Sequence, residues 1–160
     1  RLEQLNEYFK KEYNKGFLKS SPIILSNSRI SGLKAKGLFL PYLILEETNL
    51  NDADFRNAFL RYSRFTNGVV LRSDLSNSDF CNANFVKTLF IKVNFTGAEM
   101  NKTDLLETNF CEVDLQNING LEGALNLGRA DFQNGVTVTT REKEIIDLAN
   151  PKIKELILVN

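Results

Sequence analysis

Large apolar residues recur at every fifth position through the middle of the chain. From Leu45 to Leu115, fifteen successive positions spaced five apart hold Leu, Phe, Val or Met. A smaller residue lies two positions before most of them, and the residue in between is commonly Asp or Asn, as in Ala53-Asp54-Phe55. The stretch is an internal repeat, which has to be recognised before any single element is predicted.

A period of five fits neither an α-helix nor a single long strand. The small and the large residue of one unit are two positions apart, so they lie on the same side of a short extended segment. The remaining positions hold an outward side chain and a bend, where Asn and Gly recur because they tolerate positive φ. We therefore expect a coil whose large residues point to a common axis, with neighbouring coils about 4.8 Å apart.

The repeat resembles the pentapeptide-repeat family, whose units read A(D/N)LXX. The best matches are Ala53-Asp54-Phe55, Ser73-Asp74-Leu75, Ser78-Asp79-Phe80, Ala83-Asn84-Phe85 and Thr108-Asn109-Phe110. The resemblance implies an all-β fold, a right-handed quadrilateral β-helix in which four units, or about twenty residues, complete one turn. It implies little about function, because one fold hosts many activities.

The chain divides first into an N-terminal helical segment and the repeat region itself. Residues 1–22 contain an amphipathic helix with Leu2, Leu5, Phe9 and Tyr13 on one side, and we expect it to cap the first coil. Binding of this helix to a membrane surface or a partner is the alternative. Residues 23–135 are expected to form the β-helix, with a break in register near 118–123 where a bulge or short loop delays the repeat by two residues.

The C-terminal segment, residues 136–160, changes character. Thr139 or Thr140 can cap a helix. Asn150-Pro151 ends this helix and can begin a second one. The resemblance implies that C-terminal helical pieces mediate dimerisation in some family members, so the segment is either a homodimerisation element or a local cap. The sequence leaves both readings open.

Composition excludes several classes of protein. Lys and Arg number 20 and Asp and Glu number 20, so the total charge does not indicate a nucleic-acid binder. No apolar run is long enough for a membrane span. Cys81 and Cys111 are expected to point outward on opposite faces, too far apart for a disulfide, and free thiols favour a reducing, cytoplasmic location. Because the chain starts with Arg1, we expect it to be a fragment or a processed product.

Motifs for catalysis are missing from the sequence. There is no histidine to act as general base or metal ligand. No cysteine spacing fits zinc, and no phosphate-binding loop or nucleophile elbow is present. The sequence predicts no enzyme, no metal and no cofactor. A ladder of Asp54, Asp74, Asn94 and Asp114 could pass for a cation site, but backbone hydrogen bonding is the favoured interpretation because the repeat places Asp or Asn at that position.

Several outward positions are apolar where the repeat expects polar residues. With twenty residues per turn they stack into one patch of several hundred Å², a size that usually marks a contact surface. The seven residues are Val69, Leu71, Val86, Leu89, Ile91, Leu106 and Cys111. The patch could contact a protein partner, a second copy of the chain, or the chain's own terminal helix.

These observations favour a non-catalytic scaffold that presents flat faces to a protein partner. The alternative is a DNA-mimicking modulator of a type II topoisomerase, of the kind that confers quinolone resistance, an activity known in the resembled family. A mimic about 25 Å long should carry roughly fifteen net negative charges. Residues 23–135 contain thirteen acidic and eleven basic residues, a net charge of −2. Mimicry is therefore disfavoured, and direct binding of nucleic acid is not expected.

Overall fold

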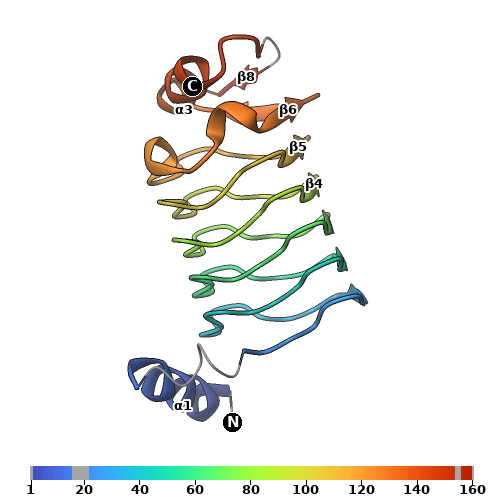
Figure 1. The fold of residues 1–160 in the computed structure, drawn as a ribbon, viewed down its shortest axis with the longest axis vertical. Coiled ribbons are helices and arrows are strands. Elements are labelled where there is room, and N and C mark those ends of the chain that lie inside the picture. The colour runs from blue at the N-terminus through green and yellow to red at the C-terminus, as the bar shows by residue number, and fades with distance from the viewer. Residues whose placement is uncertain (1, 16–21, 154–155, 160) are drawn as a thin grey trace.

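The protein is a rod of stacked coils with a helix at each end (Figure 1). The computed structural model describes residues 2–15, 22–153 and 156–159. In chain order the helices and strands are α1 Leu2–Asn14, β1 Arg29–Ser31, β2 Asn49–Asn51, β3 Val69–Leu71, β4 Leu89–Ile91, β5 Asn109–Cys111, the 3-10 helices η1 Leu121–Gly123 and η2 Leu127–Arg129, β6 Asp131–Gln133, β7 Val136–Val138, α3 Thr140–Ala149 and β8 Leu156–Leu158.

The coils advance by twenty residues per turn. Strands β1 to β6 form one parallel sheet, in which Asn49 pairs with Val69 and Val69 with Leu89. The other three sides carry single parallel bridges at the same spacing, for example Asp54 with Asp74. This arrangement confirms the predicted right-handed quadrilateral β-helix with short helices at its ends.

The core is the column of fifth-position residues along the axis. Phe55, Phe80 and Phe95 are completely buried. The rings of Phe90 and Phe110, one coil apart, stack at a centroid distance of 5.6 Å, whereas those of Phe65 and Phe85 meet edge to face. The small residue two positions earlier is also buried, because a larger one would collide with the coil wall. The sequence pattern therefore identifies the core correctly.

Hydroxyl groups at the small position tie successive coils together. Thr88 Oγ1 donates to the main-chain oxygen of Phe65 at 2.7 Å, and Ser78 Oγ donates to that of Phe55 at 2.6 Å. The same bond recurs from Thr103 and Thr108. These bonds satisfy polar groups that would otherwise be buried without partners.

The corners contain left-handed residues of many types. Tyr62 and Lys102 have φ of 61° and 59°, although neither residue is favoured in this conformation. Asn and Gly therefore account for only part of the corners. Regular pairing to the neighbouring coil overrides the local preference.

The repeat breaks at Gly120, whose φ is 71°. Asn119 still bridges Glu99 at the regular spacing and Ile118 is completely buried, so the loop is shorter than the expected 118–123. Beyond η1 and η2, Asp131 pairs with Asn109, which is a delay of two residues. A third extra residue precedes β7, because Thr137 bridges Asp114.

Helix α1 contacts the first coil through Asn6. The side-chain amide of Asn6 donates to Gly37 O at 3.1 Å and accepts from Phe39 N at 3.0 Å. One turn later the equivalent nitrogen, Phe59 N, donates to Leu38 O of the coil before it. Asn6 therefore occupies the place of a preceding coil at this point of the edge.

The C-terminal segment differs from the expected pair of helices. Helix α3 begins after Thr139, whose main-chain nitrogen donates to Glu142 Oε2 at 3.0 Å, and it packs against η1, η2, β7 and β8. The prediction that a second helix begins at Asn150-Pro151 is wrong. Instead, Leu156–Leu158 forms strand β8, which pairs with β7 in parallel. The backbone groups of both segments gain hydrogen bonds by this pairing.

Candidate functional site

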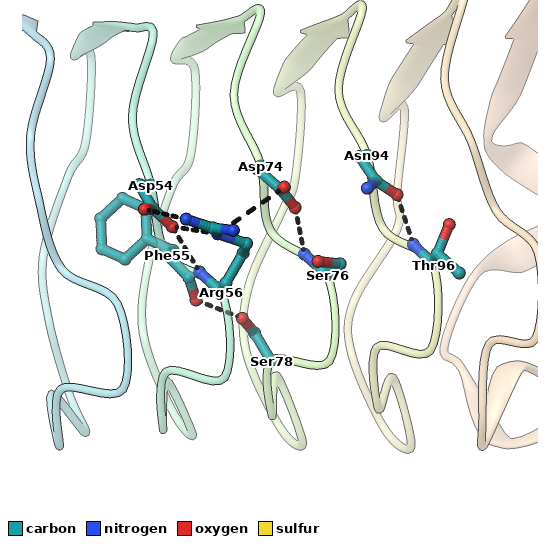
Figure 2. Close-up of polar contacts among 8 residues, drawn as sticks. All are labelled: Asp54, Phe55, Arg56, Asp74, Ser76, Ser78, Asn94 and Thr96. Atoms are coloured by element: carbon teal, nitrogen blue, oxygen red, sulfur yellow. Dashed lines mark hydrogen bonds and ion pairs between the residues drawn. The ribbon is translucent and has the colours of Figure 1, made fainter.

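The ladder of carboxylates and amides on one side of the rod is structural (Figure 2). Asp74 Oδ1 accepts from Ser76 N at 3.0 Å, and Asn94 Oδ1 accepts from Thr96 N at 2.9 Å. Asp54 and Asp114 make the same bond to the nitrogen two residues later. Asp and Asn are interchangeable here, as expected for an acceptor that closes a turn.

Asp54 also carries a bidentate ion pair. Arg56 donates to its two carboxylate oxygens at 2.9 and 2.8 Å. The bound guanidinium lowers the pKa of Asp54 to about 2. Arg56 also lies 3.9 Å from Asp74, so its single positive charge is shared between two neighbouring carboxylates of the ladder. Among the described residues, no group of three or more Cys, Asp or Glu is placed to hold a metal ion.

The two cysteines have different environments. Both are free, as the sequence predicts. Cys81 was expected at an outward position, and there only 8% of the residue is exposed, so neighbouring side chains cover it. Burial, followed by the nearby Asp79, raises the pKa of its thiol to about 11. Arg61 and Asp79 form an ion pair at 2.7 Å beside it, and this pair helps to cover the small side chain. Cys111 is only half-buried.

The seven predicted contact residues lie on and beside the six-stranded sheet. Five of them form two columns on its outer surface: Val69 pairs with Leu89, while Leu71, Ile91 and Cys111 pair in succession. Val86 and Leu106 occupy the preceding corner in successive coils, where Lys87 N donates to Leu106 O. All seven are half-buried. We call this set the apolar face.

The ends of the apolar face are polar. Asn49 and Asn51 of β2 precede it, and Asp131 and Gln133 of β6 follow it. The terminal helices α1 and α3 lie at the two ends of the rod (Figure 1). Helix α3 packs against η1, η2, β7 and β8, so the sheet surface over β3 to β5 is not where this helix is seated.

Two features of this surface were missed in the sequence. Asn109 lies in the column after Leu89, and its Oδ1 is buried without a hydrogen-bond partner. Opposite charges twenty residues apart flank the sheet: Lys87 lies 3.8 Å from Glu107, and Lys92 lies 3.5 Å from Glu112. The sequence contained the information to predict these pairs, since the two residues of each pair are separated by one full turn of twenty residues.

A second apolar surface lies on the first coils. The rings of Phe39 and Phe59 stack at 4.4 Å, and those of Tyr42 and Tyr62 stack at 5.0 Å. The guanidinium of Arg61 lies 5.3 Å from the centre of the Phe59 ring. Because Asn6 of α1 binds beside Phe39, this surface adjoins the N-terminal helix.

A groove of about 480 Å³ lies at the C-terminal end between η2 and α3. Leu127, Ile145 and Leu148 contribute to its lining, and Leu148 is 87% exposed. Among the described residues, no helix is both long and apolar enough to cross a bilayer.

Comparison with known proteins identifies the family. The pentapeptide-repeat family matches residues 42–69, 71–106 and 88–119 with eight copies of the repeat. The chain belongs to the pentapeptide-repeat family. Comparison with curated protein sequences gave no match.

Three solved structures are similar to parts of this chain. The pentapeptide repeat protein Rfr23 from the cyanobacterium Cyanothece 51142 is 16% identical, covers 78% of this chain and 97% of its own, and has a TM-score of 0.63. QnrB1, a plasmid-mediated fluoroquinolone resistance protein, is 15% identical over 78% of this chain and 95% of its own, with a TM-score of 0.48. A pentapeptide repeat protein of the Arabidopsis thaliana thylakoid lumen is 25% identical over 57% of this chain and 67% of its own, with a TM-score of 0.37. The likeness to Rfr23 supports the fold alone, because an identity of 16% carries no argument about function.

Proposed function

We propose that this protein is a non-catalytic, cytoplasmic scaffold that binds a protein partner through the apolar face. The observation that carries the proposal is the register of β3, β4 and β5, which gathers half-buried aliphatic side chains into one surface with polar ends. Surfaces of this kind on soluble proteins usually make contacts.

The rod is suited to binding because its face is preorganised. Each apolar residue of the face lies on a strand paired to both neighbouring coils or at the corner before it. The side chains are therefore fixed before the partner arrives, and little conformational entropy is lost on association. The constant register of twenty residues also repeats the columns from β3 to β5, so a partner meets a regular surface.

The chemistry of the described residues supports a role without catalysis or cofactor. The carboxylates that align on one side accept hydrogen bonds from turns, and Cys81 is buried with a raised pKa. A nucleophile or general base needs a group whose pKa and exposure suit the reaction. The buried Cys81 thiol does not meet that requirement, and the aligned carboxylates already accept hydrogen bonds from main-chain nitrogens.

The proposal is tested by placing charges in the centre of the apolar face. Leu89→Asp together with Ile91→Asp should leave the circular-dichroism spectrum unchanged and abolish capture of the partner by the purified protein. Asn94→Asp together with Thr96→Asp adds the same charge to the same coil on another side and should bind as the wild type does. If the Leu89/Ile91 variant folds and still captures every protein that the wild type captures, the apolar face is not the binding site.

The topoisomerase alternative receives less support from the distribution of charge. A mimic needs a continuous acidic side. Here acidic side chains are paired with bases along the rod, as in Asp54–Arg56, Asp79–Arg61 and Asp52–Arg72. A gyrase supercoiling assay tests this alternative. We expect neither inhibition of gyrase nor protection of gyrase from quinolones, at any protein concentration that suffices for capture of the partner.

The C-terminal segment offers a different arrangement for a homodimer. The groove between η2 and α3 lies beside the exposed Leu148, so a second copy could bind at this end. Leu148→Asp tests that contact without touching the sheet. Comparing it with the Leu89→Asp plus Ile91→Asp variant shows which of the two surfaces makes the contact.

A further inference from the structure

We infer that the occupant of the apolar face is a second copy of this chain, bound face to face and antiparallel. The two-fold axis would run along the strand direction and pass between β4 and β5. The inference rests on the proposed function, since it takes the apolar face to be a contact surface, and it specifies the partner and the geometry.

Charge complementarity carries the inference. On both sides of the sheet, the corner beside β4 is basic and the corner beside β5 is acidic: Lys87 and Lys92 flank β4, and Glu107 and Glu112 flank β5. Rotation about the proposed axis exchanges the rows of β4 and β5. It places Lys87 opposite Glu107 of the second copy and Lys92 opposite Glu112 of the second copy, on both sides of the interface.

Other registers bring like charges together. An axis between β3 and β4 would place Lys92 opposite Arg72, and Glu112 opposite Asp52. An axis on β4 would place each lysine opposite itself. A parallel arrangement would place Lys87 opposite Lys92. Since like charges that face each other across an interface are unfavourable, the corners select one arrangement.

The apolar residues of the β4 and β5 rows are compatible with that arrangement, while at the margin the same rotation brings Val69 and Leu71 of β3 over Asp131 and Gln133 of β6. The same rotation brings each residue of the β4 row over the residue of the β5 row in the same column. The facing pairs are Val86 with Leu106, Leu89 with Asn109, and Ile91 with Cys111. Asn109 Oδ1 is already closed off from water without a partner, so covering it with Leu89 loses no hydrogen bond.

The corner charges remain available for this contact. Lys92 and Glu112 pair within the chain at 3.5 Å, with side chains 55% and 50% exposed. A second copy would complete a quartet of alternating charges without breaking the existing pair. The strands are only three residues long, and the sheet rises about 4.8 Å per coil. The interface therefore falls at the small end of specific contacts, and the dimer should be weak and sensitive to salt.

The first measurement is self-association by sedimentation equilibrium at rising protein concentration. A concentration-dependent dimer is expected in the wild type and in the Leu148→Asp variant. It should be lost with Leu89→Asp plus Ile91→Asp, and retained with Asn94→Asp plus Thr96→Asp. A wild type that stays monomeric up to about 1 mM, or a dimer that is lost with Leu148→Asp and kept with the Leu89/Ile91 changes, overturns the inference.

The second measurement tests the geometry by exchanging charges. Lys92→Glu combined with Glu112→Lys restores the pair within the chain and also restores complementarity between two copies of the variant. In a mixed dimer with the wild type, like charges would face each other at both of these contacts. Energy transfer between labelled subunits should show normal self-association of the variant, and mixing with the wild type that is weaker by about fivefold or more.

If the charge-exchanged variant binds the wild type as tightly as it binds itself, the proposed antiparallel arrangement is refuted. The outcomes also separate this inference from the proposed function. A monomer that captures a different protein, and loses it through the Leu89/Ile91 changes, leaves the scaffold proposal standing and refutes the second copy as occupant.

Discussion

Ser78 Oγ donates a 2.6 Å hydrogen bond to the main-chain oxygen of Phe55, one coil earlier in the stack. Ser63 occupies the equivalent small position on the next side of the rod, is completely buried, and its Oγ has no partner. Two serines in the same repeat position therefore differ in one hydrogen bond. The comparison isolates what that bond contributes to the coil.

Removing the two hydroxyls should have different effects. Ser78→Ala is expected to lower the free energy of unfolding by about 1 kcal/mol, because a buried bond is lost. Ser63→Ala is expected to be neutral or slightly stabilising, because the unpaired hydroxyl is removed and Ala is common at this position. Urea denaturation followed by circular dichroism measures both. Equal losses would contradict the role of the bond.

Gly68 occupies a small position where the family repeat has Ala, yet the structure predicts that Ala is unfavourable there. An added Cβ would lie 2.9 Å from Thr48 O and 3.0 Å from Phe65 O, both of which are main-chain atoms. Gly68→Ala should therefore cost about 1–3 kcal/mol, the usual range for overpacking. Ala58→Ser, at the same repeat position, is the control and should cost less. A stabilised Gly68→Ala variant would show that the coil wall moves freely at this point.

The ion pair of Asp54 makes a pH-dependent contribution to stability. Its pKa is lowered to about 2 by the Arg56 hydrogen bonds, so the stabilisation is present above the unfolded pKa of 3.8 and is lost as the pH falls toward 2. Because the Arg56 side chain is 43% exposed, solvent screening keeps this contribution small.

Asp54→Asn is the variant for this measurement, since Asn94 shows that an amide still accepts the turn hydrogen bond. The variant should be less stable than the wild type at neutral pH. The difference should shrink between pH 4 and pH 2, as measured by urea midpoints at each pH. A difference that does not change over this range would mean that Arg56 contributes nothing.

The two thiols should react at very different rates. Burial raises the pKa of Cys81 to about 11, so at pH 8 only about one thiol in a thousand is ionised. Cys111 is half-buried on the apolar face and should be alkylated first. Mass spectrometry after brief treatment with a maleimide checks the order, and Cys111→Ser should leave the folded protein nearly unlabelled. Rapid labelling of Cys81 in the native state would contradict its burial.

Much of the candidate site is readable from the sequence. The apolar positions Val69, Leu71, Leu89 and Ile91 fall into adjacent columns as soon as a turn of twenty residues is assumed, and the sheet pairs them in that way. Asn109 was missed because a polar residue was expected at its position. The corner charges were missed because each was considered within its own unit rather than beside the equivalent corner of the next coil.

The five-residue spacing was sufficient to establish the coil, its core and the side of the rod on which each repeat residue lies. The physical reason is local: two residues spaced two apart in an extended segment share a side, and stacking repeats that choice in every turn. Periodicity carries no information where the repeat ends or where a small side chain depends on its neighbours. The burial of Cys81, the break at Gly120 and the pairing of β8 with β7 were therefore settled by contacts between segments distant along the chain.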